Sequence, residues 1–212
     1  MKAFQHWFYQ EVEETFGLHR NNKMPRLQNW LNADISLSEK NMAYVQELQE
    51  DLLDNVLDWN EDEMKLFFIG PLLRMIFLKE HHFKPFASRK LSMQYGNSEI
   101  KGIVDFMVAQ GKQVPRAPIF CIHEFKPETG TSNDPLGQLL IAMVTAQQIN
   151  ATVERVHPIY GAYILGRNWF FVILDDKEYA ISDAYVATQK DVIQIVRILE
   201  QSKQEIEDFL VV

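Results

Sequence analysis

The residues best suited to chemistry begin with an acid inside an expected strand. Strand alternation places Ile103, Asp105 and Met107 on one face of the segment 101–109, so that a carboxylate interrupts an apolar row. A buried charge is tolerated when it is paired or bound to a metal ion. Asp105 is therefore a candidate ligand rather than an ordinary core residue.

A second acid and a lysine follow on the next expected strand. In the segment 119–126, the two-residue period places four side chains on one face: Phe120, Ile122, Glu124 and Lys126. The apolar run before Glu124 is typical of a central strand. If this strand neighbours the one with Asp105, two carboxylates and an ammonium converge. Two hard oxygen ligands with room for water and phosphate suit Mg²⁺.

The elements that must position these residues can be read from the hydrophobic periodicity. Strands are expected at about 84–95, 100–109 and 119–125, and a helix at 135–149. Two or three strands over 160–181 and a last helix to about Leu210 complete the order α-β-β-β-α-β-β-α. Runs of strands broken by single helices predict an α/β (α+β) fold, with a mixed sheet flanked by helices.

Residues 1–57 precede this pattern and read as helical. Ser36 and Glu39 have the spacing of a capping box, and apolar residues at helical intervals follow them. So short a segment has little core of its own. We therefore expect 1–57 to be an N-terminal helical extension that packs on a core formed by 58–212.

A further helix is expected to begin at Asn60, a favourable N-cap. Glu61 and Glu63 lie in its first turn, and Gly70-Pro71 is expected to kink it. Both acids have a structural explanation, because carboxylates complement the helix dipole, and for Glu63 a capping role is the better interpretation.

Composition limits the classes of partner. The 212 residues include 21 Lys and Arg against 29 Asp and Glu, a formal net charge of -8. Contact with nucleic acid must therefore come from a local basic patch. Five residues are the candidates for phosphate contacts: Arg89, Lys90, Lys101, Arg116 and Arg167.

The single cysteine and the hydropathy indicate a compartment. Cys121 can form no internal disulfide and has apolar neighbours, which suggests a packed core thiol and favours a reducing cytoplasm. No apolar run approaches the ~20 residues that span a bilayer. The first ten residues lack the apolar core of a signal peptide. We expect a cytoplasmic protein without a membrane partner.

The acids and the lysine carry a resemblance to a known family. Gly102-Ile103-Val104-Asp105, followed by Glu124-Phe125-Lys126, resembles the acid and the E-x-K pair of the PD-(D/E)XK nuclease superfamily. Val104 stands where the usual dipeptide has proline. The segment from Asn60 to Leu73 resembles the Asn-Glu and Ile-x-Pro-Leu-Leu helix opening of type I restriction-enzyme nuclease domains.

Two further residues match this family pattern. Glu61 falls on the family's helical glutamate, and Gln138 resembles the glutamine that many members carry in the helix after the E-x-K strand. Ala142 stands where a tyrosine often follows that glutamine. The resemblance covers about residues 60–200 and does not explain 1–57.

The resemblance implies a restriction-endonuclease-like fold and a metal-dependent endonuclease or exonuclease. Its expected substrate is nucleic acid, with DNA as the first candidate. Asp105, Glu124 and the Phe125 carbonyl would bind Mg²⁺, with Mn²⁺ as a substitute. Glu61 would bind the same ion through water or help to hold a second. Lys126 would hold or help deprotonate the attacking water and stabilise the transition state. The form of the substrate and the oligomeric state, a homodimer included, are left open.

Two rival functions use the same residues. A catalytically inactive member would keep the nuclease fold as a nucleic-acid-binding or protein-interaction module, which the acidic balance favours. A drifting scaffold has no physical reason to keep buried charges, which argues for the enzyme. An unrelated carboxylate-lysine enzyme on a similar sheet is the third interpretation.

The remaining titratable residues near these strands have structural explanations. Glu124 and Lys126, taken alone, would be solvated charges at a strand end. His123 alternates away from Glu124 and is interpreted as a packed core histidine. His81 and His82 are adjacent, so their side chains point in different directions, and no site is assigned to them.

Overall fold

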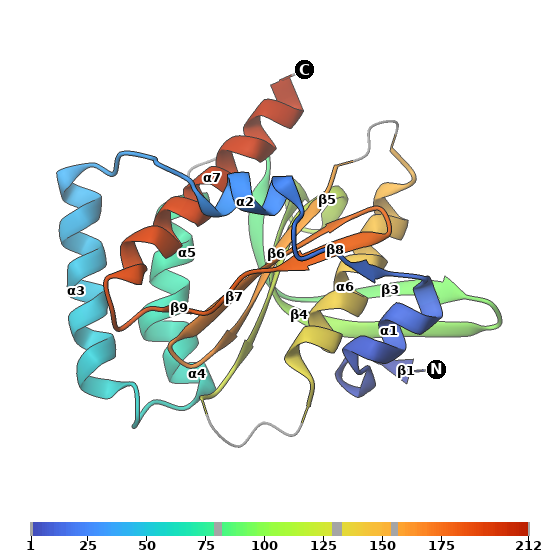
Figure 1. Cartoon of the computed structure of the whole chain (residues 1–212), viewed down its shortest axis with the longest axis horizontal. Helices are drawn as coiled ribbons and strands as arrows, with labels where there is room; N and C mark the ends of the chain where they lie inside the picture. Colours follow the sequence, from blue (N-terminus) through green and yellow to red (C-terminus); the bar gives the residue numbers. More distant parts are fainter. Residues whose placement is uncertain (1, 79–81, 129–132, 154–156, 212) are drawn as a thin grey trace.

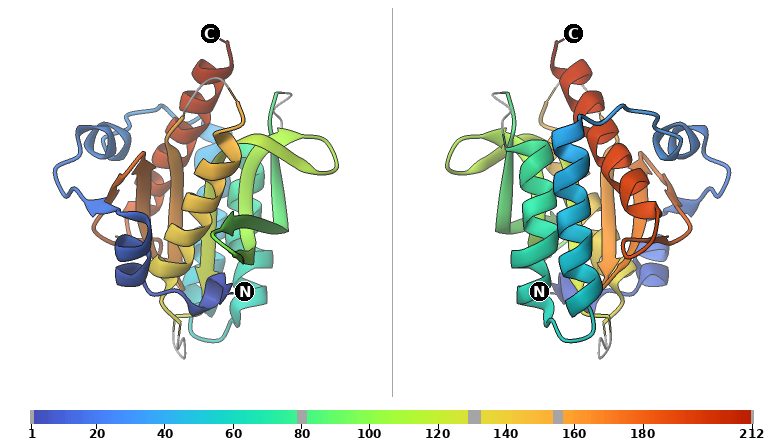
Figure 2. Two further views of the ribbon diagram at one scale, coloured as in Figure 1. Left: turned by 90° about the vertical axis from the view of Figure 1, so that its right-hand side faces the viewer. Right: turned by 90° about the vertical axis from the view of Figure 1, so that its left-hand side faces the viewer.

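The structure is built on one nine-stranded mixed sheet with helices on both faces (Figures 1 and 2). It is a computed structural model, and it describes residues 2–78, 82–128, 133–153 and 157–211. The strand order is β1-β4-β5-β6-β7-β8-β2, with β3 paired to β4 and β9 paired to β7. The expected α+β class and mixed sheet flanked by helices are confirmed.

The strands follow the chain in pairs and short runs. They are β1 (Lys2–Ala3), β2 (His19–Arg20), β3 (Lys84–Tyr95), β4 (Ser98–Gly111), β5 (Pro115–Lys126), β6 (Ile159–Leu165), β7 (Asn168–Asp175), β8 (Glu178–Ile181) and β9 (Tyr185–Val186). The parallel pair β5–β6 is connected through helix α6, whereas β3–β4, β4–β5 and β6–β7 are antiparallel.

The helices are more numerous in the first third of the chain. They are η1 (Phe4–His6), α1 (Tyr9–Phe16), α2 (Pro25–Leu31), α3 (Glu39–Asn55), α4 (Glu61–Met64), η2 (Lys65–Ile69), α5 (Gly70–Phe77), α6 (Pro135–Asn150) and α7 (Asp191–Val211). Within the described residues, no helix is long and apolar enough to cross a membrane.

The N-terminal 57 residues are not purely helical, which corrects the expectation. β1 pairs with β4 and β2 pairs with β8, so the segment adds a strand to two separate places in the sheet. Backbone pairing of only two residues leaves no apolar alternation to detect in a sequence. The cap of α3 is also different: the Ser38 hydroxyl, not that of Ser36, accepts the Asn41 N–H at 3.2 Å.

The strands that carry the candidate site match their expected positions closely. β3 has the expected bounds, and the turn at Gly96-Asn97 connects Tyr95 to its partner Ser98. One expectation is wrong: Phe120 does not share a face with Ile122. Ile119 pairs with Ala109 and Cys121 with Val108, so Phe120 is the extra residue of a β-bulge.

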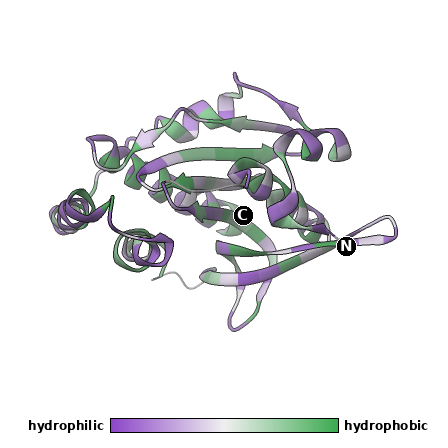
Figure 3. Cartoon of the chain, turned by 90° about the horizontal axis from the view of Figure 1, so that it is seen from below, coloured by the Kyte–Doolittle hydropathy of each residue, from purple (hydrophilic) through white to green (hydrophobic). Residues whose placement is uncertain are grey.

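Two hydrophobic clusters lie on the two faces of the sheet. Figure 2 shows the helices that cover these faces. One cluster joins the sheet to α2, α3, α5 and α7, and the other joins it to η1, α1 and α6. Residues of 1–57 contribute to both clusters, for example Leu52 to the first and Phe4 to the second. Hydrophobic and hydrophilic residues alternate along most elements in Figure 3, as expected when one face is buried.

The sheet splits where the candidate acids lie. β3 pairs with one edge of β4 along nearly its whole length, so β5 and β1 must share the other edge. β5 pairs there up to Phe106–His123, and β1 takes over at Ile100 and Lys101. The β3–β4 hairpin projects past the rest of the sheet (Figure 1). Asp105 is located in the gap between the two partners.

Candidate active site

Asp105 is held at the split by one backbone group and one lysine. Its Oδ2 accepts the Phe125 N–H at 2.9 Å, and its Oδ1 accepts a hydrogen bond from Lys65 Nζ at 2.9 Å. The backbone pairing of β4 with β5 ends at Phe106–His123, and the Asp105 side chain supplies the hydrogen bond to β5 at the next position. Its exposed fraction is 18%. The carboxylate is oriented by the fold and still reachable from solvent.

Glu124 is the most buried acid of the site, with an exposed side-chain fraction of 2%. Its Oε1 accepts hydrogen bonds from Lys126 Nζ at 2.6 Å and from Gln138 Nε2 at 2.5 Å. Lys126 Nζ also donates to the Phe125 carbonyl at 3.0 Å. The E-x-K residues and the glutamine of α6 therefore form one hydrogen-bonded group on one face of β5.

The two acids are close enough to perturb each other. Burial raises the pKa of Glu124 to about 8, the charge of Asp105 adds to the rise, and the ammonium of Lys126 opposes it. A carboxyl with such a pKa is protonated through much of the neutral range unless another cation approaches. Strong perturbation of a buried acid beside one that solvent can reach is typical of functional sites.

Glu61 joins the group through Lys65, which is not among the site residues predicted from the sequence. Lys65 Nζ donates to Glu61 Oε1 at 2.5 Å and to Asp105. Burial lowers the pKa of Lys65, but the hydrogen bonds to Glu61 and Asp105 outweigh this effect and raise it. Glu61 and Lys65 are four residues apart on a helix, the spacing of an ion pair, and this signal could have identified Lys65.

The helix of Glu61 is interrupted by a π-helical turn, where a proline kink was expected. The Gly70 N–H bonds to the Lys65 carbonyl, five residues earlier, and a Cβ on Gly70 would lie 2.6 Å from that oxygen. Proline at position 71 lacks an N–H, so this part of the helix accommodates a different hydrogen-bond pattern. The π turn begins at Lys65, beside the acids. Such turns occur frequently at functional sites.

The start of the same helix agrees with the interpretation from sequence. Asn60 and Glu63 form a reciprocal capping box, in which the Asn60 side chain accepts the Glu63 N–H and the Glu63 carboxylate accepts the Asn60 N–H. The capping role of Glu63 is confirmed. Glu61 is free of that role and turns toward Lys65.

A hollow of 620 Å³ opens beside Asp105, between α5 and the β3–β4 hairpin. Its lining is mainly apolar and includes Leu66, Phe86 and Phe125. Ser88, also in the lining, has φ of 51° and interrupts the β3–β4 register opposite Asp105. A left-handed serine in a strand is uncommon, and such backbone strain concentrates at functional positions.

No protein-family model matches this chain, and no curated protein matches it by sequence. Function must therefore be inferred from the site.

The donor set fits a hard divalent cation. Asp105, Glu124 and the Phe125 carbonyl supply only oxygen donors, which Mg²⁺ and Mn²⁺ prefer. Gln138 Oε1 is buried and has no hydrogen-bond partner in the described part of the chain, so a water or ion would satisfy it. In that same part, no three acids, histidines or cysteines are grouped closely enough to hold an ion. Glu61 reaches the pair only through Lys65.

The remaining candidates lie outside this group. His123 is fully buried against Phe106, with ring centroids 5.4 Å apart, and burial lowers its pKa to about 3, which confirms a packed histidine. Cys121 is buried as expected. His82 lines a hollow with Lys112 and Arg116, and His81 lies outside the described residues.

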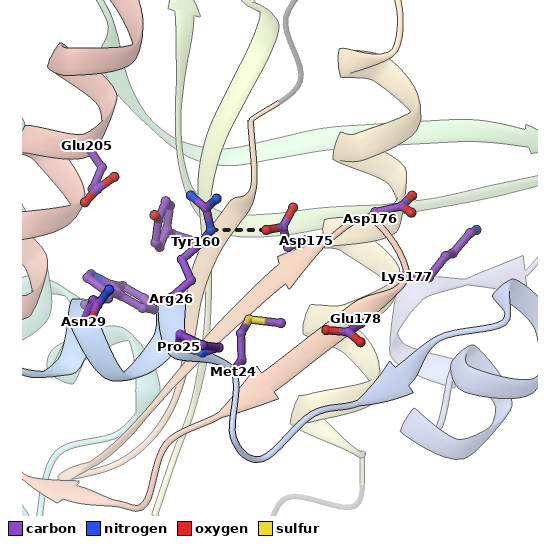
Figure 4. Close-up of a pocket in the computed structure, with 11 residues that line it drawn as sticks. Met24, Pro25, Arg26, Asn29, Tyr160, Asp175, Asp176, Lys177, Glu178 and Glu205 are labelled. Carbon is purple, nitrogen blue, oxygen red and sulfur yellow. Dashed lines mark ion pairs between the residues drawn. The ribbon is translucent and has the colours of Figure 1, made fainter.

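A second and larger cavity lies toward the other end of β6 and β7 (Figure 4). We call it the acidic cavity. It has a volume of 890 Å³, and Arg26 of α2 makes an ion pair there with Asp175 at 3.2 Å. Its lining consists of Met24, Pro25, Arg26, Asn29, Trp30, Tyr160, Asp175, Asp176, Lys177, Glu178 and Glu205.

Proposed function

We propose that this protein is a metal-dependent phosphodiesterase of the PD-(D/E)XK type that hydrolyses nucleic acid, with DNA as the first candidate substrate. One observation carries the proposal: side chains from five elements, α4, η2, β4, β5 and α6, converge at the split of the sheet. We call this group the carboxylate cluster; it consists of Glu61, Lys65, Asp105, Glu124, Lys126 and Gln138. Buried charges are costly, so their assembly from distant parts of the chain favours a function.

The chain's own residues have distinct tasks in this proposal. The Phe125 N–H and Lys65 fix the Asp105 carboxylate, and Gln138 fixes Glu124. Lys126 places an ammonium within reach of both Glu124 and the Phe125 carbonyl. An ammonium there can hold the attacking water or stabilise charge that develops on a phosphate oxygen.

Asp105, Glu124 and the Phe125 carbonyl would hold Mg²⁺, and Glu61 would act through water. A bound Mg²⁺ would supply an acidified water and neutralise phosphate charge. The buried, unpaired thiol of Cys121 is compatible with the reducing cytoplasm, the compartment that we propose.

The test combines a binding and an activity measurement. Wild type should bind Mn²⁺ in calorimetry and cleave single- or double-stranded DNA with Mg²⁺ or Mn²⁺ but not with EDTA. Asp105→Asn should lose both properties. Asp175→Asn, in the acidic cavity, is the matched control and should keep them. Equal Mn²⁺ affinity in wild type and Asp105→Asn would refute the assignment of the site.

A second function is favoured by one feature of the cluster. Each acid of the cluster already has a lysine as its ion-pair partner, Lys65 for Glu61 and Asp105 and Lys126 for Glu124. Such pairing needs no metal, and it suits a catalytically inactive module that keeps the nuclease fold for binding. If wild type loaded with Mn²⁺ cleaves no form of DNA or RNA, this alternative replaces the enzyme.

A further inference from the structure

Positive charge is concentrated in one part of this acidic chain. The stretch 82–116, which contains β3, β4 and the following turn, has six Lys and Arg against two Asp and Glu. It therefore carries a formal charge of +4 in a chain of -8. A local excess of this kind attracts polyanions even when the net charge is negative.

The structure separates the five basic candidates into two groups. Lys101 is paired with Glu99 at 2.8 Å, and Arg167 makes a bidentate contact with Glu128, with the closest distance at 2.6 Å. These two are neutralised. Arg89, Lys90 and Arg116 are exposed, and none of them makes an ion pair with a carboxylate of the described residues.

The three unpaired cations also gather in one place. Arg89, Lys90 and Arg116 line a single hollow of 360 Å³ between β3 and the β4–β5 turn. Arg116 also lines a neighbouring hollow of 580 Å³, together with Lys112 and His82. We call this surface the basic groove. It consists of Arg89, Lys90, Lys112 and Arg116.

The basic groove and the carboxylate cluster are one strand apart in the sheet. Arg89 pairs in the sheet with Val104, the residue before Asp105. A chain of phosphates that lay in the groove would therefore pass within one strand of the acid that we assign to the metal. Anionic lipid heads or an acidic peptide would gain nothing from this adjacency, whereas a phosphodiester backbone would.

We propose that the basic groove binds the nucleic-acid backbone and leads one phosphodiester to the carboxylate cluster. The role of the groove in leading a phosphodiester to the cluster rests on the proposed function. Binding of nucleic acid in the groove does not require catalysis. Phosphate contacts of this kind are independent of sequence and release counterions. The groove therefore predicts binding that is tolerant of sequence and sensitive to salt.

The experiment measures fluorescence anisotropy of labelled single- and double-stranded oligonucleotides in EDTA, where no cleavage occurs. The test variant is Arg89→Gln/Lys90→Gln/Arg116→Gln. The control is Lys101→Gln/Arg167→Gln/Lys177→Gln, which removes the same charge from cations outside the groove. The test variant should bind at least about tenfold more weakly at ~0.1 M salt, with a salt slope lower by about one per residue removed. The control should stay within about threefold of wild type.

The possible outcomes test the basic groove and the proposed catalysis separately. Equal affinity of the test and control variants overturns the groove, even if wild type cleaves DNA. Salt-sensitive binding through the groove without cleavage supports the groove and removes the proposed catalysis. Binding of wild type to anionic vesicles but not to oligonucleotides overturns the groove as a nucleic-acid site. Aggregation of the test variant at unchanged affinity would show that these charges only protect the free edge of β3.

Discussion

The carboxylate cluster and the acidic cavity differ in how they hold charge. The acidic cavity is the larger hollow, but its Arg26–Asp175 pair is exposed, with side-chain fractions of 48% and 39%. In the carboxylate cluster, Glu124 is 2% exposed and bonded to two other side chains. Exposed pairs contribute little and cost little, whereas a buried acid needs a reason to persist. Desolvated charge is therefore a better guide to chemistry here than the size of a cavity.

The largest effect is expected from removing Lys126, one of the two lysines of the carboxylate cluster. Lys126→Ala should reduce cleavage by about 10²- to 10³-fold, because transition-state charge loses its ammonium. Mn²⁺ binding should be largely intact. Lys177→Ala in the acidic cavity should leave cleavage within about twofold. The assay compares the variants with wild type at matched Mn²⁺ occupancy, and undiminished cleavage by Lys126→Ala would remove that residue from the mechanism.

The second-largest effect is expected in the pH dependence of stability, which should differ between the carboxylate cluster and the acidic cavity. The folded pKa of Glu124 is raised to about 8 from an ordinary value of 4.5, mainly by burial. The folded state thus holds a proton that the unfolded state releases, and stability is lost as pH rises from about 4.5 to about 8. Glu124→Gln should remove this loss and be more stable than wild type at pH 8 by about 4 kcal/mol.

The measurement is chemical denaturation in EDTA across this pH range. Glu205→Gln, which replaces an acid of the acidic cavity, is the control and should keep the slope of wild type. A Glu124→Gln variant with the wild-type slope would mean that Glu124 is ionised in the folded protein.

A smaller effect is expected at Lys65. Its ammonium bonds to Glu61 and Asp105, so it competes with a divalent ion for the same carboxylates. Lys65→Met should raise Mn²⁺ affinity about three- to tenfold, since a nearby positive charge is removed. Calorimetry would measure this, with Lys101→Met as the control at a partly exposed ion pair outside the cluster. Weaker binding by Lys65→Met would show that Lys65 orients the ligands instead.

The smallest effect is expected at the ion pair of the acidic cavity. Arg26→Met should change the free energy of unfolding by no more than about 0.5 kcal/mol, because exposed pairs are screened by solvent. Cleavage and Mn²⁺ affinity should not change. Denaturation with urea measures the stability. A loss of more than about 2 kcal/mol in the free energy of unfolding would show that the Arg26–Asp175 pair stabilises the fold. The acidic cavity would then not differ from the carboxylate cluster in the way described above.

Much of the fold could be predicted because its strands carry strong local signals. Residues 135–149 are a nearly continuous apolar run of helical length, and the turn at Gly96-Asn97 marks the hairpin of β3 and β4. The cluster could also be predicted in part, because alternation along β5 fixes Glu124 and Lys126 on one face. Gln138 was placed by resemblance alone, and the structure brings it to Glu124.

The rest depends on contacts between segments that are distant in sequence. The strands β1 and β2 exist only because β4 and β8 offer free backbone groups. The bulge at Phe120 depends on the register with β4, which alternation within one strand does not contain. The gap at Asp105 has the same origin, because it forms where β5 leaves β4.

The π-helical turn has a consequence for how such a site can be gained and lost. A π turn accommodates one residue more than an α-helical turn. It lies between two pairs of residues, Glu61 and Lys65 at the site and Leu72 and Ile76 in the core. The side chains of the first pair can therefore point in a direction that does not depend on the second pair. Deletion of one residue between them would rotate the first pair by about 100° and leave the second in place. Ancestors and descendants of this chain can thus differ by a single codon between an assembled site and an intact but inert scaffold.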